Sequence, residues 1–286
     1  MSWQIYGVLI RMSYNNIAWM GGSYSPPTRM HVTVALEMGK ALSKLGGKSA
    51  VCIVPVSGKY KKGSVRDECI TQENRWALAE AFLSAIKSES DGSVDYLLMD
   101  YEFKAAAAVP TINSLEILKS QEFCSPETNI YIAQGRDNIE GIFSRSWVRS
   151  DELIRTYKFF MFPRGDKPYT TEQMMTTLTT DNEKQKFPPI SAEEAYGIAN
   201  GVILVGENFN DDTSSSKVRA LIREGGAIDE FIHPLVLSVL KGIPDAYTNG
   251  SCEVTPASGG MRKTKGKNRK TKGKNRKAKR RTKGKK

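Results

Sequence analysis

The chain has 286 residues, of which 40% are hydrophobic, and its 42 Lys+Arg against 31 Asp+Glu give a formal net charge of +11. The charge is concentrated at one end, because residues 261–286 hold 16 basic and no acidic residues, which leaves 26 basic and 31 acidic residues, a net charge of −5, in residues 1–260. A core-forming but mildly acidic body excludes a nucleic-acid-binding domain with positive charge spread over its surface.

The distribution of apolar and metal-ligating residues excludes further classes. No uncharged apolar run approaches the roughly 20 residues of a membrane-spanning helix. The six-residue run Ile5–Ile10 is shorter than the core of a signal peptide. The cysteines form no Cys-x-x-Cys pair, and only His31 and His233 could supply nitrogen ligands, so we expect no protein-built metal site. We therefore expect an intracellular, soluble protein with free thiols and no membrane partner.

Strand-like and helix-like segments alternate along the chain. Apolar, β-branched runs predict strands at Asn16–Met20, Ser49–Val56, Asp95–Met99, Asn129–Ala133, Lys158–Phe162 and Val202–Val205. Helical spacing of apolar residues predicts helices at His31–Leu45, Asn74–Ile86, Thr111–Lys119 and Asp151–Thr156, with another beginning at Ser214. This order predicts an α/β fold with a Rossmann-like, doubly wound parallel sheet.

Ligands of such sheets bind beyond the carboxyl ends of the strands, where we expect the loops Gly21–Thr28 and Gly135–Trp147. Residues 165–195 are polar and rich in Thr and Pro, and we expect a mobile excursion there. The folded domain is expected to span residues 1–250.

The C-terminal tail, residues 251–286, is predicted to be disordered and rich in Lys and Arg. It repeats Thr-Lys-Gly-Lys-Asn-Arg-Lys at 264–270 and 271–277, and no position of this repeat is apolar, so a coiled coil would have no seam to bury. The expected behaviour is salt-dependent binding of polyanions. Two roles stay open: nuclear targeting, or attachment to nucleic acid or an acidic partner.

The most informative segment is Gly21–His31, which follows a strand and opens a helix. Its paired glycines let main-chain N–H groups approach a ligand closely. The helix that follows offers N–H groups and a positive dipole end that suit a phosphate. Thr28 and His31 are three residues apart and can face the same ligand. An ordinary β-α turn with a capping Thr is the alternative.

A second candidate phosphate site is the helix N-terminus at Ser214–Arg219. A capping role explains one hydroxyl but not the three consecutive serines, Ser214, Ser215 and Ser216. Together with the helix N–H groups they can cradle a triphosphate, and Arg219 can add paired contacts to phosphate. His233, which precedes Pro234, is expected to have a structural role.

These segments resemble a known family. Gly21–His31 is similar to the opening signature of the nucleotidylyltransferase superfamily, and Thr28-Arg29-Met30-His31 resembles its form in eukaryotic-type nicotinamide/nicotinic acid mononucleotide adenylyltransferases. The resemblance continues, in the same order, at Pro55–Gly63, Tyr101-Glu102, Gly135-Arg136-Asp137 with Trp147, and Ser214–Arg219. The chain departs from the family pattern at Val54, Asn74, Tyr101 and Arg136, which bears on base selectivity more than on the reaction type.

The resemblance implies adenylyl transfer. The phosphate of a pyridine mononucleotide attacks the α-phosphorus of Mg-ATP, and a dinucleotide and pyrophosphate leave, with Mg²⁺ carried in by ATP. Such a reaction needs alignment and charge neutralisation rather than a protein nucleophile. The resemblance assigns catalytic roles to His31, Lys62 and Arg219, with Lys59 and Lys61 as alternatives to Lys62.

The same resemblance implies two groups of binding residues. ATP would contact Thr28, Gly135, Asp137, Ser214, Ser215, Ser216 and Lys217. The mononucleotide would contact Gly22, Ser23, Tyr24, Tyr101, Glu102 and Trp147, with the indole of Trp147 stacked on the pyridine ring.

Two alternatives remain beside this interpretation. One is another nucleotidylyltransferase, of a cytidylyltransferase-like or pantetheine-phosphate type, against which Pro55–Gly63 and Trp147 argue. The other is a weakly active nucleotide-binding relative whose basic tail tethers it to nucleic acid. The choice between the nicotinamide and nicotinic acid forms of the substrate stays open, as does a homo-oligomeric state.

Overall fold

The computed structural model describes residues 13–60, 70–163, 169–180, 190–206 and 213–248, and the backbone of two short strands before them. Its body is a six-stranded sheet in the order β5-β4-β3-β6-β7-β8, and all neighbouring strands are parallel. The strands are β3 (Asn16–Gly22), β4 (Ser49–Pro55), β5 (Asp95–Leu98), β6 (Asn129–Gly135), β7 (Lys158–Phe162) and β8 (Ile203–Leu204). β1 (Gln4–Ile5) and β2 (Val8–Leu9) form a separate antiparallel pair. The predicted parallel α/β sheet is confirmed.

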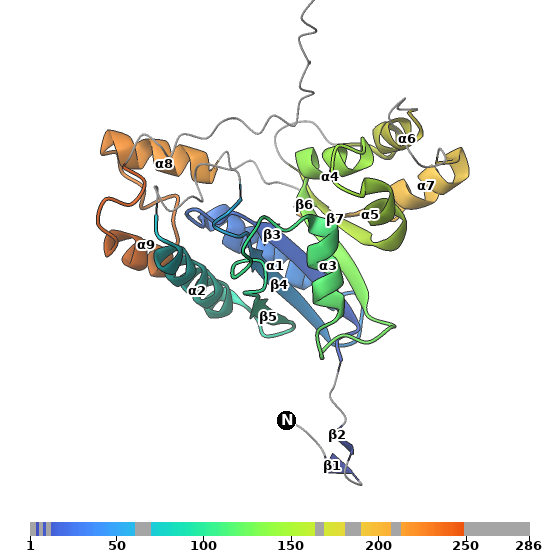
Figure 1. The fold of residues 1–286 in the computed structure, drawn as a ribbon, viewed down its shortest axis with the longest axis horizontal. Helices are drawn as coiled ribbons and strands as arrows, with labels where there is room; N and C mark the ends of the chain where they lie inside the picture. The colour runs from blue at the N-terminus through green and yellow to red at the C-terminus, as the bar shows by residue number, and fades with distance from the viewer. Residues whose placement is uncertain are drawn as a thin grey trace, which may run out of the picture.

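Helices cover both faces of the sheet, because successive strand residues point to opposite sides. Ala18 and Met20 belong to one apolar core, whereas Ile17 and Trp19 belong to the core on the other face. The first core is covered by α1 (Arg29–Ser43), α2 (Gln72–Glu89), α8 (Ser215–Glu224) and α9 (Pro234–Lys241). The second is covered by α3 (Thr111–Lys119), α4 (Arg136–Phe143), α5 (Ser150–Thr156), α6 (Thr171–Thr179) and α7 (Ala192–Asn200). Figure 1 shows α2, α8 and α9 gathered away from α3–α7.

Two segments that were expected to lack regular structure contain helices. Residues 136–143, expected as part of a loop, form α4, because Ile139, Ile142 and Phe143 recur at helical spacing and are buried. The expected excursion at 165–195 was wrong at 171–179, where α6 begins with a reciprocal cap between Thr170 and Gln173. It was also wrong at 192–195, the start of α7 after its cap Ser191. Residues 164–168 and 181–189 lie outside the described part of the chain.

The register of the sheet opens a crevice between two central strands. β3 pairs with β4 along its whole length, up to Gly22 opposite Pro55. Its pairing with β6 ends earlier, at Trp19 opposite Ile132. Because the chain winds from β3 toward β4 on one side and returns to β6 on the other, this is the switch point at which ligands of open α/β sheets bind.

Some expectations concern residues outside the described part of the chain. The predicted tail and its boundary at 250/251 lie beyond Thr248, the last described residue, and stay predictions. In the described part of the chain, no helix combines the length and hydropathy that a membrane crossing requires. Nor do three His, Cys, Asp or Glu side chains come together there in a way that could hold a metal ion.

Candidate nucleotide site

A cavity of ≈ 260 Å³ lies at the carboxyl edge of the sheet, where β3 and β6 separate. Its walls are the ends of β3, β6 and β7 and the first turns of α1, α4 and α8. The structure brings ten of the sequence-predicted residues to this cavity: Gly22, Ser23, Tyr24, His31, Gly135, Asp137, Ser214, Ser215, Ser216 and Arg219. The two segments singled out as phosphate sites, which are about 190 residues apart, therefore share one cavity.

Three helix N-termini meet at the cavity. α1 follows its cap Thr28, α4 follows Gly135, and α8 follows Ser214, whose side chain accepts the main-chain N–H of Lys217. The first N–H groups of a helix have no partner within the helix, and each helix end carries about half a positive charge. Three such ends around one cavity favour an anion of high charge. Asp137, in the first turn of α4, also lines the cavity, and the negative charge of its carboxylate acts against the binding of an anion.

The His31 ring is oriented by the cap of its own helix. Its Nδ1 accepts the main-chain N–H of Thr28 at 3.0 Å and lies 2.8 Å from the Thr28 hydroxyl. The ring also packs edge-on against Tyr24 and Phe82. Since Nδ1 accepts a main-chain hydrogen bond, the neutral imidazole carries its proton on Nε2. His31 therefore brings a hydrogen-bond donor to the cavity wall, and Thr28, which does not line the cavity, acts by holding the ring.

The paired glycines are required by two aromatic rings. A Cβ at Gly21 would lie 2.2 Å from the Trp19 ring, and a Cβ at Gly22 would lie 2.9 Å from the Tyr24 ring. Tyr24 is buried, has φ of 43°, and donates its hydroxyl to the carbonyl oxygen of Met20 at 2.6 Å. Its ring is thus part of the protein wall of the cavity. The predicted contact of Tyr24 with a mononucleotide stays a prediction.

Arg219 is a buried cation that binds the loop after β3. It is 2% exposed, its Nη1 donates to the carbonyl oxygen of Ser25 at 2.6 Å, and its Nη2 donates to Ser216 Oγ at 3.1 Å. Its Nε has no hydrogen-bond partner among the described residues. Burial lowers the pKa of the guanidinium. The side chain thus joins the loop to α8 and lines the cavity at the same time.

Gln134 and Asn138 line the cavity and were not predicted. Gln134 Nε2 donates to the carbonyl oxygen of Gly21 at 3.0 Å, and its Oε1 accepts from Asn138 Nδ2 at 2.6 Å. The first bond bridges β3 and β6 beyond the point where their main-chain pairing ends, and the second joins β6 to α4. A signal was available in the sequence, because an amide that directly follows the apolar run 130–133, at the end of a predicted buried strand, needs a buried partner.

Some of the described residues that were predicted for the site do not line the cavity, and Lys59, which is exposed, is one of them. Lys61 and Lys62 fall outside the described residues. The ammonium of Lys217 lies over the Phe231 ring, 4.6 Å from its centre. Tyr101 shares Ser114 Oγ with the indole N–H of Trp19.

Glu102 is a buried carboxyl next to this polar group. It is 3% exposed, and burial raises its pKa to about 7, partly offset by a hydrogen bond with Ser114. The carboxyl contributes to raising the pKa of both Tyr24 and Tyr60, for which burial is the larger cause. The charge of Glu102 therefore acts on tyrosines of both the glycine loop and the segment that follows β4.

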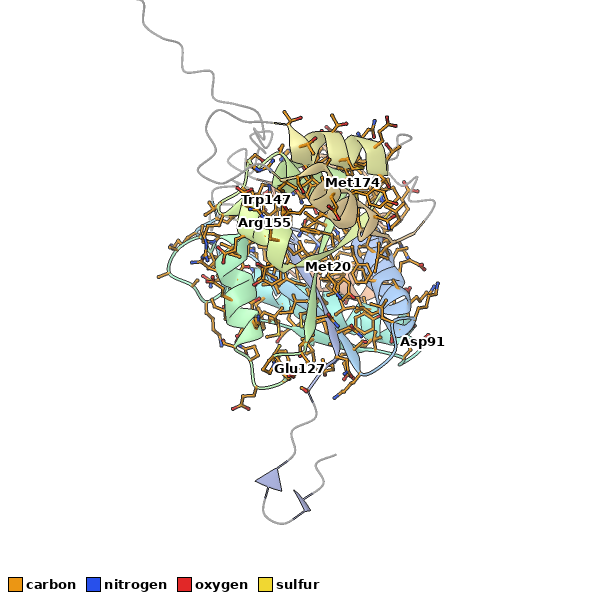
Figure 2. The ribbon with its side chains drawn as sticks, turned by 90° about the vertical axis from the view of Figure 1, so that its right-hand side faces the viewer. Met20, Asp91, Glu127, Trp147, Arg155 and Met174 are labelled. Carbon is orange, nitrogen blue, oxygen red and sulfur yellow. The ribbon has the colours of Figure 1, made fainter. Side chains whose placement is uncertain are left out.

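Trp147 lies beside α4 in a loop held by a polar network. Its main-chain N–H donates to Ser150 Oγ, and its indole nitrogen would be 2.9 Å from a Cβ at Gly141. Gly141 comes three residues after Asn138, so the indole lies one turn along α4 from the cavity wall. Figure 2 labels Trp147, in the loop between α4 and α5, and Met20, which lies within the sheet on β3.

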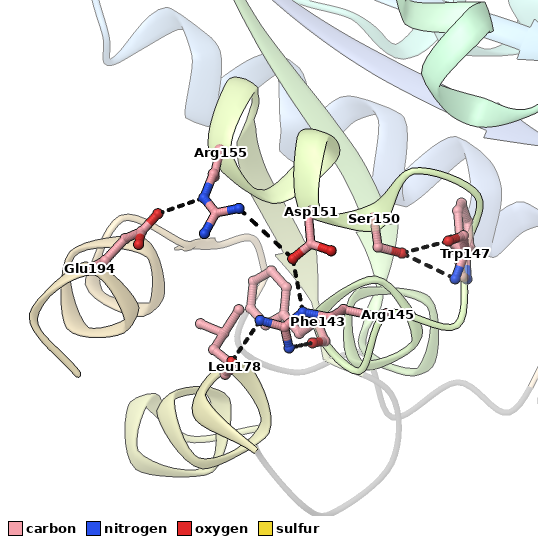
Figure 3. A network of polar contacts seen from close by, with 8 residues as sticks. All are labelled: Phe143, Arg145, Trp147, Ser150, Asp151, Arg155, Leu178 and Glu194. Atoms are coloured by element: carbon pink, nitrogen blue, oxygen red, sulfur yellow. Dashed lines mark hydrogen bonds and ion pairs between the residues drawn. The ribbon is translucent and has the colours of Figure 1, made fainter. Parts of the chain in front are cut away.

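The network around that loop contains a buried ion pair (Figure 3). Arg145 and Asp151, 5% and 8% exposed, are paired at 2.9 Å, and Arg145 also donates to the carbonyl oxygens of Leu178 and Phe143. Arg155 joins Glu194 of α7 at 2.9 Å. Because a buried charge is stable only when it is paired, Arg145 is held by Asp151 and by the Leu178 carbonyl oxygen of α6. The more exposed Arg155–Glu194 pair links α5 to α7.

The chain matches one family model and is similar to two relatives that carry the same name. Residues 19–221 match the family model described as cytidylyltransferase-like. A probable nicotinate-nucleotide adenylyltransferase of Helicobacter pylori is 26% identical over 153 residues, which cover 54% of this chain and 77% of that protein. A protein of the same name from Caldicellulosiruptor saccharolyticus is 26% identical over 160 residues, 56% of this chain and 69% of that protein.

Solved structures agree on the fold. The Plasmodium falciparum nicotinic acid mononucleotide adenylyltransferase complexed with NaAD superposes with a TM-score of 0.53 at 20% identity, over 79% of this chain and 95% of that chain. A second structure of that protein, complexed with APC, gives a TM-score of 0.52 over 79% and 94% of the two chains. The likeness extends the sheet topology described above to these enzymes.

Proposed function

We propose, on the premise that this chain belongs to the cytidylyltransferase-like family, that it transfers the adenylyl group of ATP to a pyridine mononucleotide. The chain is a nucleotidyltransferase, and two relatives at 26% identity carry the name nicotinate-nucleotide adenylyltransferase. The observation that carries the proposal is the meeting of three helix N-termini and His31 around one cavity at the switch point of the sheet.

In the proposed reaction a phosphate oxygen of the mononucleotide attacks the α-phosphorus of ATP. The bond from the α-phosphorus to the bridging oxygen of the β-phosphate breaks, and pyrophosphate leaves. No group of the protein becomes bonded to the substrate, so catalysis consists of aligning two anions and neutralising their charge. Mg²⁺ enters with ATP as part of that substrate.

In this proposal, residues at the start of α1 and α8 neutralise the charge of the two anions. His31 would donate from Nε2 to an oxygen of the α-phosphate as negative charge develops there. The first turn of α8, with Ser214, Ser215 and Ser216, would hold the β- and γ-phosphates. Both groups are held in position before any ligand arrives, by Thr28 and by Arg219 respectively.

The remaining predicted residues divide between the two nucleosides. Gly135 and Asp137, at the start of α4, would hold the ATP sugar. Gly22 and Ser23 would contact the mononucleotide phosphate. Tyr101, Glu102 and Trp147, which do not line the cavity described above, would contact the pyridine end of the mononucleotide. Both the nicotinamide and the nicotinic acid forms fall within the proposal.

The test is a synthesis assay with purified protein, ATP, Mg²⁺ and each mononucleotide in turn. Formation of the dinucleotide and equimolar pyrophosphate is expected, and the ratio of kcat/KM for the two mononucleotides gives the preferred form. His31→Ala should lower kcat by about 100-fold or more, as loss of one transition-state donor does.

The chain offers a matched control in its other histidine. His233 caps α9 and pairs with Glu89 at 3.0 Å, and it does not line the cavity. His233→Asn keeps a capping side chain, so kcat should stay near the wild-type value. A wild-type protein that makes neither dinucleotide nor pyrophosphate from either mononucleotide ends the proposal.

A further inference from the structure

The loop between β3 and α1 is held by side chains from distant parts of the chain. The carbonyl oxygen of Ser25 accepts from Arg219 at 2.6 Å, and that of Pro26 accepts from Ser215 Oγ at 2.8 Å. Arg75 of α2 donates to the carbonyl oxygen of Val56 at 2.8 Å and makes a longer contact of 3.5 Å to that of Ser23. The loop, whose residues Gly22–Tyr24 line the cavity, is therefore held in place through its main-chain carbonyl oxygens.

One of these supports comes from the last described segment of the chain. The hydroxyl of Ser25 lies 2.8 Å from the hydroxyl of Tyr247, which is 222 residues away in sequence. Both residues are 0% exposed. Since a buried hydroxyl costs free energy unless it is hydrogen-bonded, this contact stabilises the buried Tyr247 hydroxyl and ties it to the loop.

The backbone around Tyr247 is held in a conformation that costs free energy. Tyr247 has φ of 62° and Asp245 has φ of 52°, both in the left-handed region that non-glycine residues avoid. Such conformations persist only where the surrounding structure imposes them. The Tyr247 ring fills a core position among residues of α1, α2, α8 and α9. A phenylalanine would fill that position equally well, so packing explains the ring but not the hydroxyl.

Burial, and not the neighbouring charges, keeps the hydroxyl of Tyr247 protonated. Burial raises its pKa to about 12, while the hydrogen bond to Ser25 and the cations of Arg75 and Arg219 act in the opposite direction. The phenol is therefore neutral at physiological pH and can donate or accept a hydrogen bond. Its function is geometric and does not require ionisation.

We propose that Tyr247 is a positioning residue of the nucleotide site, whose hydroxyl holds the β3–α1 loop in place through Ser25. It does not line the cavity, and it acts through the Ser25 side chain on the loop that does. The inference rests on the proposed function for its kinetic readout, and nucleotide binding gives a second readout that is independent of turnover.

The decisive variant is Tyr247→Phe, which removes the hydroxyl and keeps the ring. We expect kcat/KM for dinucleotide synthesis to fall about tenfold and the dissociation constant of ATP to rise about fivefold, which is the range expected for one lost hydrogen bond that positions a ligand-binding loop. Ser25→Ala should have a similar effect. The double variant should be no worse than either single variant, because both changes break the same hydrogen bond.

Tyr14→Phe is the matched control. Tyr14 is also buried, and it donates its hydroxyl to Asp95 at 2.7 Å, at the amino-terminal edge of the sheet, opposite the cavity. It should lower the melting temperature as Tyr247→Phe does and leave kcat/KM and ATP affinity unchanged. If Tyr247→Phe behaves in the same way, Tyr247 only stabilises the fold and the inference is wrong.

The two proposals fail separately. Should the wild-type chain bind ATP but make no dinucleotide, the proposed function is lost, and the ATP affinity of Tyr247→Phe still decides the role of Tyr247. Additive effects of Tyr247→Phe and Ser25→Ala on ATP affinity would overturn the inference even in an active enzyme. A chain that binds no nucleotide overturns both.

Discussion

We predict that Glu102 makes the protein less stable as the pH rises, which is the opposite of the usual effect of an acidic side chain. Its carboxyl is 3% exposed, and burial raises its pKa from 4.5 to about 7. The folded state therefore binds a proton more tightly than the unfolded state does. By linkage, the contribution of Glu102 to stability is greatest below pH 4.5, falls as the pH rises from 4.5 to 7, and is constant above 7.

The size of this effect follows from the shift in pKa. Each pKa unit corresponds to about 1.4 kcal/mol, so the wild-type protein should lose up to about 3 kcal/mol from this group between pH 4.5 and 8. Glu102→Gln has no ionisable group at this position. Its free energy of unfolding should therefore exceed that of the wild type by more at pH 8 than at pH 5.

The assay is urea-induced unfolding of both proteins at several pH values between 4.5 and 8. Glu127→Gln is the control, because Glu127 is exposed and its removal should leave the wild-type pH profile in place. Parallel profiles for the wild type and Glu102→Gln would refute the reasoning, since another group would then be responsible for the titration.

Three further predictions concern two glycines and the tail. Gly21→Ala should destabilise the protein by about 1–3 kcal/mol in thermal unfolding, because its Cβ would lie 2.2 Å from the Trp19 ring. Gly197→Ala in α7, where a Cβ meets nothing within 4 Å, should instead stabilise the protein by up to about 1 kcal/mol. Deletion of residues 251–286 should abolish salt-sensitive retention on a DNA column and leave turnover intact, whereas loss of turnover would contradict the predicted division between body and tail.

Local sequence patterns were sufficient for the fold and for the two segments, Gly21–His31 and Ser214–Arg219, whose residues line the cavity. The alternation of apolar runs with helix-periodic segments predicted the parallel sheet, because each strand and helix is encoded by neighbours within a few residues. The capping chemistry at Thr28 and Ser214 is equally local, since a cap and its helix are adjacent in the chain. The same information was present for α4 and α6, whose apolar spacing and caps are plain in the sequence but were not used.

What the sequence determined about this protein is thus its order of elements and the chemistry of its motifs. Only the tertiary structure decided which side chains pack against or bond to other parts of the protein, and which line the cavity. The glycine pair makes room for Trp19 and Tyr24, and the Arg219 guanidinium binds the loop carbonyl of Ser25. The bond from Ser25 to Tyr247 joins residues 222 positions apart. Such contacts depend on packing between elements that are remote in the chain, and no local periodicity encodes them.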